Sequence, residues 1–521
     1  MRAAARSLVG AALFAAAALC PLAAAAPYDE PLRPQFHFTP AQHWMNDPNG
    51  LVWADGEWHL FFQYHPYSDV WGPMHWGHAV SRDLLHWQEL PVALSPDARG
   101  MIFSGSIVDD SHDTSGFGRD GRAPLVAMYT IHDEARKARG LMGFESQGLA
   151  FSTDAGRTWK KFARNPVLTL PTQPDFRDPK LFWHAPSARW VVVLATGDHV
   201  GIYTSRDLRH WRHESDFGAG LGAHAGVWEC PDLTPLPHEG GTRWLLLVSV
   251  GEGAPNGGSG TQYFVGDFDG HTFRADAVPA ARWVDYGTDD YAGSTWSGGP
   301  RGDARTLFIA WMSNWQYATR VPTSPWRSAM TLPRELSLAP GASGPSSPLR
   351  LRSLPARELQ ALRQTTLPIA ARELSGDAEL LPAAGTAGGL LELELRVQAG
   401  ESGRFALRFA NAAGEAVVLD VDRTAGRYTL DRHASGNVGF DAKFAGAQGA
   451  PIAAAPEGAI VIHAFVDRSS IELFLDDGLT TMTALAFPSG VFDSIRLEPA
   501  SPVRVEEGAL HILRSSWPQA R

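Results

Sequence analysis

The sequence predicts an all-β fold, a five-bladed β-propeller followed by a C-terminal β-sandwich. Three observations lead to this prediction. Short runs of β-branched and aromatic residues, each followed by a turn that contains Asp, recur through the first two thirds of the chain. No stretch of useful length there has apolar residues at the 3.6-residue period of a helix. A segment rich in Pro, Gly and Ser then precedes a second series of short alternating strands.

The turn that closes each predicted blade has its own signature. These turns share Ser, Asp and a closing aromatic residue, or a looser form of that pattern, at 81–87, 152–159, 205–211 and 267–273. A turn Asp accepts hydrogen bonds from backbone N–H groups just after it, so we expect the Asp of each turn to be structural. The Trp side chains are expected to pack between blades. Intervals of roughly fifty to seventy residues favour five blades.

The predicted domain boundaries follow from these patterns. The propeller is expected over 27–337, a linker over 338–366 and the sandwich over 367–521. The linker prediction rests on the Pro-, Gly- and Ser-rich stretch at 338–349, with a short helical stretch around 355–363. Seven or more short strands with polar turns follow, which favours a sandwich that acts as a structural brace.

The N-terminus has the pattern of a secretory signal peptide over residues 1–26. Arg2 and Arg6 give a positive start, residues 8–19 an apolar core, and small residues at 23–26 a cleavage region. We therefore expect a secreted protein, extracellular or periplasmic. No later stretch approaches 18 uninterrupted apolar residues, so no membrane span is expected. Cleavage would leave Cys230 without an intramolecular disulfide partner.

The net charge of the chain limits the classes of molecule that it is expected to bind. The formal net charge is −11, and no run of Lys and Arg gives the concentrated basic surface that nucleic acid or an anionic membrane requires. A neutral substrate is the partner that this composition favours. The 18 Trp residues suit stacking on sugar faces, although many of them are expected to be packing residues.

Three short blocks carry carboxylates, and each has a plain structural interpretation. Residues 44–50 (WMNDPNG) would form a tight turn around Asp47 in almost any protein. Residues 176–180 (FRDPK) place Asp178 beside Arg177 as an ion pair. Residues 228–232 (WECPD) place Glu229 beside an apolar Trp, where desolvation raises the pKa of a carboxyl group. The three acids fall in different predicted blades, whose inner strands converge on one centre.

Together these blocks resemble the defining motifs of glycoside hydrolase family 32, the invertase, inulinase and levanase family. The resemblance extends over about residues 35 to 515 and is greatest to the secreted exo-acting branch. Further matching blocks lie at 61–66, 71–78, 103–106, 285–287, 311–318, 466–472 and 487–489.

The resemblance implies a division of labour among the three acids. Asp47 would be the nucleophile that attacks the fructosyl carbon, and Glu229 the acid and base. Asp178 would stabilise the transition state, while Arg177 orients it or pairs with Glu229. Asp232 is expected to help set the protonation of Glu229. A moderately acidic pH optimum follows, because Asp47 must be ionised while Glu229 keeps its proton.

The resemblance also implies a set of substrate-binding side chains and no cofactor. The expected binding residues are Asn46, Gln63, Trp71, Phe103, Ser104, Arg177 and Trp315. His75 and His78 have a spacing found among metal ligands, but no Cys or carboxylate clusters with them, and no metal is expected.

The implied activity is that of a retaining exo-β-fructofuranosidase acting on levan, inulin and sucrose, as a monomer. A sucrose-preferring invertase, a disaccharide-releasing levan hydrolase and a fructosyltransferase would use the same three acids. A different class is a carbohydrate-binding propeller without catalysis, which three intact carboxylates disfavour. A five-bladed furanosidase of another family is disfavoured by the block at 46–50.

Overall fold

The computed structural model describes residues 28–278, 280–341, 347–381, 388–399, 403–453 and 458–518. The predicted signal peptide lies outside this range. The regular structure of the described chain is almost all β-strand, with 53% of residues in strands and 4% in helices, which confirms the predicted all-β class. Its helical elements are short: α1 (Glu134–Ala138), η1 (Ala185–Ser187), η2 (Ala318–Arg320) and η3 (Arg357–Leu362). None of the described helices is long and apolar enough to cross a membrane.

The N-terminal part of the described chain contains five sheets. The first consists of β21 (Trp326–Arg327), β1 (His43–Ala54), β2 (Glu57–His65), β3 (His75–Ser81) and β4 (Gln88–Leu94). The second consists of β5 (Met101–Asp109), β6 (Leu125–His132), β7 (Glu145–Ser152), β8 (Lys160–Lys161) and β9 (Leu168–Thr169). The third consists of β10 (Phe176–His184), β11 (Arg189–Thr196), β12 (His199–Ser205) and β13 (Trp211–Phe217).

The other two sheets of this part follow the same order. The fourth consists of β14 (Trp228–His238), β15 (Gly241–Val250), β16 (Gly260–Phe268), β17 (Phe273–Ala275) and β18 (Arg282–Trp283). The fifth consists of β19 (Tyr291–Thr295), β20 (Thr306–Met312), β22 (Ala329–Met330), β23 (Arg334–Ala339) and β24 (Arg350–Pro355).

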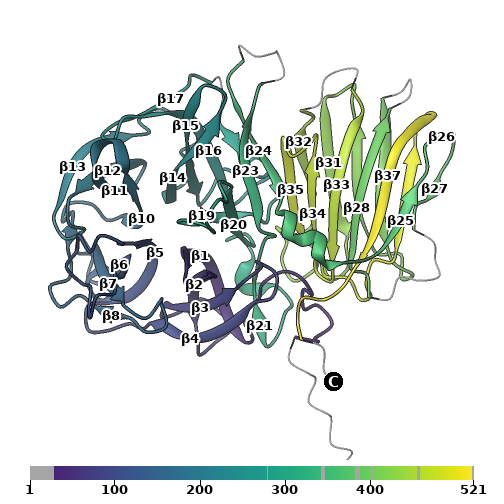
Figure 1. Ribbon diagram of the computed structural model, residues 1–521. Coiled ribbons are helices and arrows are strands. Elements are labelled where there is room, and N and C mark those ends of the chain that lie inside the picture. The colour runs from purple at the N-terminus through teal and green to yellow at the C-terminus, as the bar shows by residue number, and fades with distance from the viewer. Residues whose placement is uncertain are drawn as a thin grey trace, which may run out of the picture.

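The first strands of the five sheets face one another at the centre of this part (Figure 1). Residues of β1 contact β5, β5 contacts β10, β10 contacts β14, β14 contacts β19, and β19 contacts β1. The contacts therefore close into a ring of inner strands. The short strand β21 also pairs in parallel with β1, which ties a segment near the end of this part to its first sheet.

The predicted turns occur between the last two strands of a sheet, and their Asp residues are structural as expected. Asp83 Oδ1 accepts hydrogen bonds from the N–H groups of Leu85 and His86, at 3.0 and 2.9 Å. Asp207 makes the same pair of bonds two repeats later, again at 3.0 and 2.9 Å. Asp154 Oδ1 accepts from Thr158 N at 2.9 Å. These bonds are local, which is why sequence alone predicts them.

The Trp residues of these turns also lie where the sequence predicts. The indole N–H of Trp87, Trp159 and Trp211 in each case donates to a carbonyl three residues earlier, at 2.9 or 3.0 Å. Each ring packs against a core cluster whose members come from two neighbouring sheets. The turn is thus fastened to its own sheet by a hydrogen bond and to the next sheet by apolar contact.

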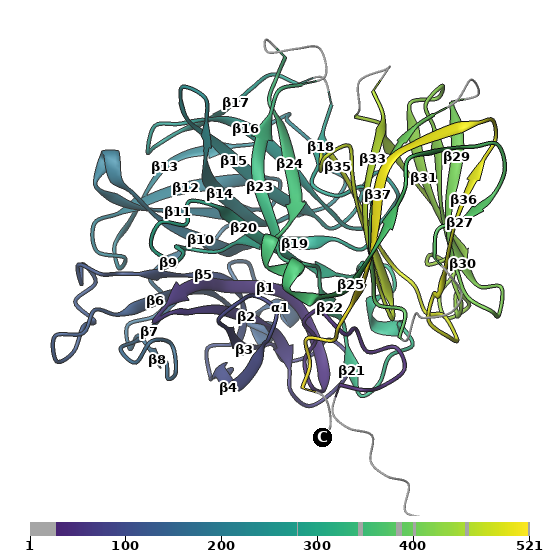
Figure 2. The same cartoon turned by 45° about the vertical axis from the view of Figure 1, so that its right-hand side comes forward.

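The C-terminal half of the described chain has two sheets. One consists of β25 (Arg363–Ile369), β26 (Arg372–Leu374), β28 (Leu391–Gln398), β33 (Ile460–Asp467), β34 (Ser470–Leu475), β35 (Thr480–Leu485) and β37 (Val503–Leu513). The other consists of β27 (Ala378–Glu379), β29 (Arg404–Ala410), β30 (Ala416–Asp422), β31 (Arg427–Ala434), β32 (Ala447–Pro451) and β36 (Ser494–Pro499). Figure 2 shows them as two layers beside the N-terminal part.

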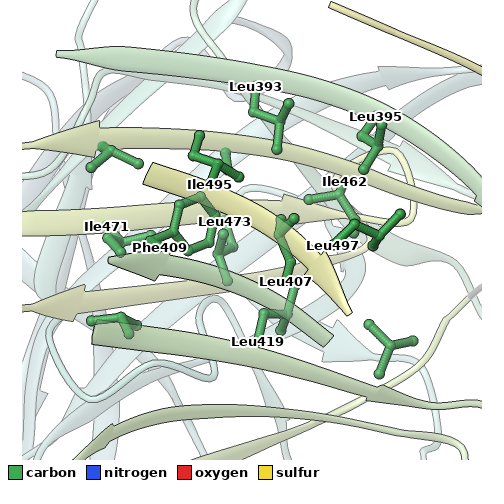
Figure 3. Packing of buried hydrophobic residues seen from close by; sticks show 14 of the residues in the cluster. Leu393, Leu395, Leu407, Phe409, Leu419, Ile462, Ile471, Leu473, Ile495 and Leu497 are labelled. Atoms are coloured by element: carbon green, nitrogen blue, oxygen red, sulfur yellow. The ribbon is translucent and has the colours of Figure 1, made fainter. Parts of the chain in front are cut away.

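One apolar core fills the space between these two layers (Figure 3). Leu393 and Leu395 point into it from β28, and Leu407 and Phe409 from β29, in each case alternating with less buried residues. This period of two is what a strand with one buried face requires. Replacing Leu407, which is fully buried, with Ala would lower the free energy of unfolding by about 2–5 kcal/mol.

The predicted linker needs correction. Within 338–366 the structure has β24, which pairs along its length with β23, then η3 and the beginning of β25. Residues 342–346 of the Pro-, Gly- and Ser-rich stretch lie outside the described residues. The stretch therefore connects two paired strands of the fifth sheet, because Pro, Gly and Ser favour a hairpin connection as much as a domain linker.

Buried ion pairs join the two halves. Arg334 of β23 contacts Glu472 of β34 at 2.7 Å and Asp285 at 3.0 Å, and the side chains of Arg334 and Glu472 are fully buried. His37 lies between Asp467 and Glu472, at 2.7 and 2.9 Å. Removing one partner of such a pair leaves a buried charge, which destabilises a protein by about 3–5 kcal/mol.

Candidate active site

The three motif acids lie at the same level of three different sheets, near the beginning of the inner strand. Asp47 is in β1, Asp178 in β10 and Glu229 in β14. At this level the pairing of each inner strand with the next strand skips two residues: 46–47 in β1, 178–179 in β10 and 230–231 in β14. Such bulges redirect side chains, and they recur beside active sites.

The remaining two inner strands have the same interruption, at 103–104 in β5 and at 292–293 in β19. Three of the skipped residues have a left-handed backbone, with φ of 62° at Asp178, 46° at Cys230 and 52° at Ala292. A non-glycine residue in this region is strained by on the order of 1 kcal/mol or more, so the surrounding structure must hold it there. The strain is concentrated where the inner strands meet.

One cavity of about 280 Å³ opens at this level. All ten residues that the sequence predicts for catalysis and binding line it: Asn46, Asp47, Gln63, Trp71, Phe103, Ser104, Arg177, Asp178, Glu229 and Trp315. Eight of them come from strands of four different sheets, and Trp71 and Trp315 come from connections, so no local feature of the chain could bring them together.

Asp47 is held by hydrogen bonds to both carboxylate oxygen atoms. Asn46 Nδ2 donates to Oδ1 at 3.0 Å, and Ser104 Oγ donates to Oδ2 at 3.1 Å. Burial raises the pKa of Asp47 to about 6, helped by the negative charge of Glu229 and opposed by the bond from Asn46. The carboxyl group is therefore fixed in orientation and is ionised above pH 6.

Asp178 is the most buried of the three acids, with 7% of its surface exposed. Its Oδ2 accepts a hydrogen bond from the backbone N–H of Cys230 at 3.0 Å. Burial raises the pKa of Asp178 to about 8, with Glu229 and Asp47 adding to the rise and Arg177 opposing it. The Cys230 thiol lies between two acids, 3.6 Å from Asp178 Oδ2 and 3.7 Å from Asp47 Oδ2.

Glu229 has a different partner on each oxygen atom. Arg177 donates to Oε1 from Nη2 at 3.0 Å and from Nε at 3.3 Å. The hydroxyl group of Tyr291, which is 1% exposed, donates to Oε2. The predicted pairing of Arg177 with Glu229 is thereby confirmed. A quarter of the Glu229 side chain stays exposed, so a ligand in the cavity can reach it.

Three of the predicted binding residues have features suited to a sugar. Gln63 is 2% exposed and lines the cavity, and within the described structure its Nε2 has no hydrogen-bond partner. A buried donor without a partner is costly, so a ligand hydroxyl in the cavity would satisfy it. Trp71 and Phe103 meet edge to face with ring centres 6.2 Å apart, and together they give the cavity an aromatic wall.

Sequence reasoning missed five cavity residues and Tyr291. The missed lining residues are His132, Lys137, Phe144, Glu145 and Asp175. None belongs to the three motif blocks, so only the pairing of β6 with β7 and the packing of β10 reveal them. The contacts of Asp232 are to other groups: Lys180 Nζ lies 2.7 Å from its carboxylate, which also accepts a hydrogen bond from Thr295 N at 2.7 Å.

His75 and His78, whose spacing is found among metal ligands, each have a separate hydrogen-bond partner within the protein. His75 Nδ1 donates to the Pro73 carbonyl at 2.8 Å, and His78 Nε2 lies 3.0 Å from His59 Nδ1. Among the described residues, one group of three side chains has metal-ligand spacing, Glu392, Glu394 and His463. Arg363 already pairs with both glutamates, at 2.5 and 2.7 Å, and places a positive charge there.

Family models match both halves of the chain. The Glycosyl hydrolases family 32 N-terminal domain matches residues 37–345, and the Glycosyl hydrolases family 32 C terminal matches residues 358–509. The first range contains the cavity with its three acids, and the second contains most of the two C-terminal sheets.

Similar proteins agree with this match. The levanase of Bacillus subtilis is 45% identical over 94% of this chain and 72% of its own length. An extracellular exo-inulinase of Aspergillus niger is 41% identical over 96% of this chain and 98% of its own length. The crystal structure of exo-inulinase from Aspergillus awamori superimposes with a TM-score of 0.85 at 38% identity, covering 94% of this chain and 100% of that one. The chain therefore belongs to glycosyl hydrolase family 32.

Proposed function

We propose that this protein is a retaining exo-β-fructofuranosidase, which hydrolyses terminal β-D-fructofuranosyl residues of fructans such as levan and inulin, and sucrose. The observation that carries the proposal is the set of three acids in one cavity, each with different partners. Asp47 is held by Asn46 and Ser104, whereas Glu229 is held by Arg177 and Tyr291. The similarity to a levanase and to exo-inulinases supports this substrate class.

In the first step Asp47 attacks C2 of the fructosyl unit and forms an ester bond. The bond from C2 to the leaving oxygen breaks, and that oxygen takes the proton of Glu229. The hydrogen bonds from Asn46 and Ser104 fix the Asp47 carboxylate for this attack. Asp178 binds hydroxyl groups of the ring, and its oxygen atoms stabilise the positive charge that develops on it.

In the second step the roles of Glu229 reverse. Glu229 has lost its proton, so it accepts one from a water molecule that attacks C2. The ester bond to Asp47 breaks, fructose leaves with retained configuration, and Glu229 regains its proton. Arg177 and Tyr291 keep the Glu229 carboxyl in one place through both steps.

The proposal also covers the domain architecture, the location and the oligomeric state of the protein. The five N-terminal sheets are the blades of a five-bladed β-propeller, which the ring of contacts among β1, β5, β10, β14 and β19 supports. The two C-terminal sheets form a sandwich that braces it. Because the linker contains β24, the catalytic domain extends beyond residue 337 to about Pro355. The protein is secreted and acts as a monomer, with extracellular relatives in support.

Product analysis on levan, inulin and sucrose tests the proposal. An exo-acting hydrolase releases fructose alone from both polymers from the first time point. Disaccharides from levan, or fructosylated products from concentrated sucrose, would instead identify a disaccharide-releasing hydrolase or a transferase. The small cavity favours a terminal unit over an internal segment of a polymer.

Two variants separate catalysis from binding. Glu229→Gln and Asp47→Asn keep the shape of the site and remove the acid or the nucleophile. Both should lower kcat by about 100-fold or more while fructose binding, measured by calorimetry, is retained. Activity equal to that of the unmodified protein in either variant would refute the assignment and favour a binding protein.

A further inference from the structure

Arg177 shares its guanidinium group between two sides of the cavity. On one side Nη2 and Nε donate to Glu229, at 3.0 and 3.3 Å. On the other side Nη1 donates to Glu145 at 3.1 Å and to Asp175 at 2.6 Å. Arg177 Nε also lies 3.9 Å from Asp178. One positively charged group therefore lies close to four carboxylates. The contacts that it makes with the other three affect how strongly it acts on Glu229, the acid of the proposed reaction.

Glu145 is held firmly in its position against Arg177. It begins β7, and it lies directly opposite His132, the last residue of β6. Its Oε1 is 3.0 Å from His132 Nδ1, and its Oε2 accepts the backbone N–H of Phe176 at 2.9 Å. Only 2% of the side chain is exposed. Both oxygen atoms are thus engaged, so the carboxylate has no freedom to turn away from Arg177.

His132 anchors Glu145 to the wall of the cavity. Its Nε2 lies 3.0 Å from Glu134 Oε2, at the beginning of α1. Its ring stacks on Phe103, with centres 4.2 Å apart and planes 19° apart. Phe103 is skipped in the bulge of β5 beside Ser104, which donates to Asp47. The position of Glu145 is therefore tied to the aromatic side of the site.

We propose that Glu145 is a positioning residue, which together with Asp175 competes with Glu229 for the Arg177 guanidinium and so limits how strongly that positive charge acts on the Glu229 carboxyl group. This inference rests on the proposed function, because it concerns the acid of that reaction. Glu145 itself takes no part in bond-making.

Electrostatics gives the inference a definite sign. The positive charge of Arg177 favours the ionised form of Glu229, whereas negative charges nearby disfavour it. The negative charge of Glu145 weakens the effect of the Arg177 charge, and it adds to the effect of the other nearby negative charges. Although burial opposes it, Arg177 and then His132 hold the pKa of Glu145 below its ordinary value, so Glu145 is charged where the enzyme works. Neutralising Glu145 should therefore move the alkaline limb of the activity profile to lower pH.

The other charged or titratable groups that face these residues are unchanged in the test. Those that act on Glu229 come from four strands, namely Asp47 of β1, Arg177 and Asp178 of β10, Cys230 of β14 and Tyr291 of β19. Lys137 of α1 lines the same cavity. If the alkaline limb of the pH profile shifts only when Glu145 or Asp175 is changed, the shift is therefore attributable to the contacts of these residues with Arg177.

The test compares pH profiles of kcat/KM on sucrose for the full chain and its Glu145→Gln variant. Gln has the shape of Glu and can still accept from Arg177 and Phe176. We expect the alkaline limb to move to lower pH by roughly half a unit to one unit, with a three- to tenfold loss on that side. The acid limb and KM should stay in place. Glu134→Gln is the matched control, because Glu134 contacts His132 but not Arg177, and both limbs should stay in place.

Asp175→Asn provides an independent second variant, since Asp175 is more exposed than Glu145 and its loss is less of a threat to folding. Its alkaline limb should move in the same direction by a smaller amount. A uniform loss of activity at every pH, or an unmoved alkaline limb in both variants, would show that Glu145 is only structural. An unmodified protein that hydrolyses no fructoside would count against the proposed function instead.

Discussion

Arg177 contacts Glu229 along one edge of its guanidinium group, with Nη2 3.0 Å and Nε 3.3 Å from the same oxygen atom. The contact joins β10 of the third sheet to β14 of the fourth sheet. It places a permanent positive charge beside the acid of the proposed reaction, and several consequences of this arrangement are measurable.

Removing the charge of Arg177 should change the pH profile in the sense opposite to the change at Glu145. In Arg177→Gln the group that favours ionised Glu229 is lost, so the alkaline limb should move to higher pH. We also expect kcat/KM to fall about 100-fold, because the carboxyl groups around Arg177 lose their shared partner. Arg177→Lys keeps the positive charge but lacks the planar guanidinium group with its several donors. The alkaline limb of this variant should therefore stay in place while its kcat/KM falls. An alkaline limb at lower pH in Arg177→Gln would contradict this reasoning.

The acid limb should report Asp47. Its pKa is raised to about 6 by burial, so kcat/KM should fall about tenfold for each pH unit below 6. Ser104 donates a hydrogen bond that favours the ionised form. In Ser104→Ala the acid limb should therefore move to higher pH by a few tenths of a unit. Rate profiles on sucrose measure both effects, and Ser106→Ala serves as a control, since Ser106 bonds to the Pro179 carbonyl instead.

The Cys230 thiol should be unreactive in the folded protein. Burial and the neighbouring acids, Asp178 first among them, raise its pKa well above the ordinary value, and the thiolate is the reactive form. Alkylation by iodoacetamide at pH 8, followed by mass spectrometry, should be slow in the folded chain and fast after denaturation. Using a chain without residues 1–26 removes Cys20 from the measurement. Rapid alkylation of the folded chain would mean that the thiol is not held as described.

Stability should depend on the protonation of His37. Its pKa is raised to about 9: burial opposes the rise, but the bonds to Asp467 and Glu472 outweigh it. A raised pKa contributes stability that is fully present below pH 6.5 and is lost as pH rises towards 9. The contribution is on the order of 3 kcal/mol.

Urea unfolding at a series of pH values measures this contribution. The difference in unfolding free energy between the unmodified protein and His37→Gln should shrink between pH 6.5 and 9. Asp178 and Asp290, whose pKa values are raised to about 8 chiefly by burial, add a pH dependence of their own in both proteins, so the comparison rests on the difference between the two curves. A difference that does not vary with pH would show that His37 is neutral in its buried position. The same curves report whether the two halves unfold together.

Features that depend on neighbours in the sequence could be predicted. The turn bonds of Asp83 and Asp207 join atoms two or three residues apart, so the residue types alone specify them. The short strands of the C-terminal part, such as Ile460–Asp467 and Ser470–Leu475, are of the kind that the sequence predicts there. The linker was mistaken because Pro, Gly and Ser give the same local signal in a hairpin connection.

Features that depend on register and on contacts between sheets could not be predicted. The two skipped residues in each inner strand are a property of pairing, and pairing joins residues far apart in the chain. Tyr291 contacts Glu229 from β19 of the neighbouring sheet. Glu145 contacts Arg177 from the beginning of β7. The contact of the Asp232 carboxylate with Lys180 likewise joins two neighbouring sheets and could not be read from the sequence.

The sequence by itself determined the all-β class, the repeated turns, the family and the identity of the three acids. These follow from local residue patterns and from the resemblance of short blocks to known motifs. Only the tertiary structure decided that the acids share one cavity, which oxygen atom of Glu229 each partner binds, and how Arg177 is divided among its carboxylates. The physical reason is that protonation depends on distance and burial, which the folded chain alone defines.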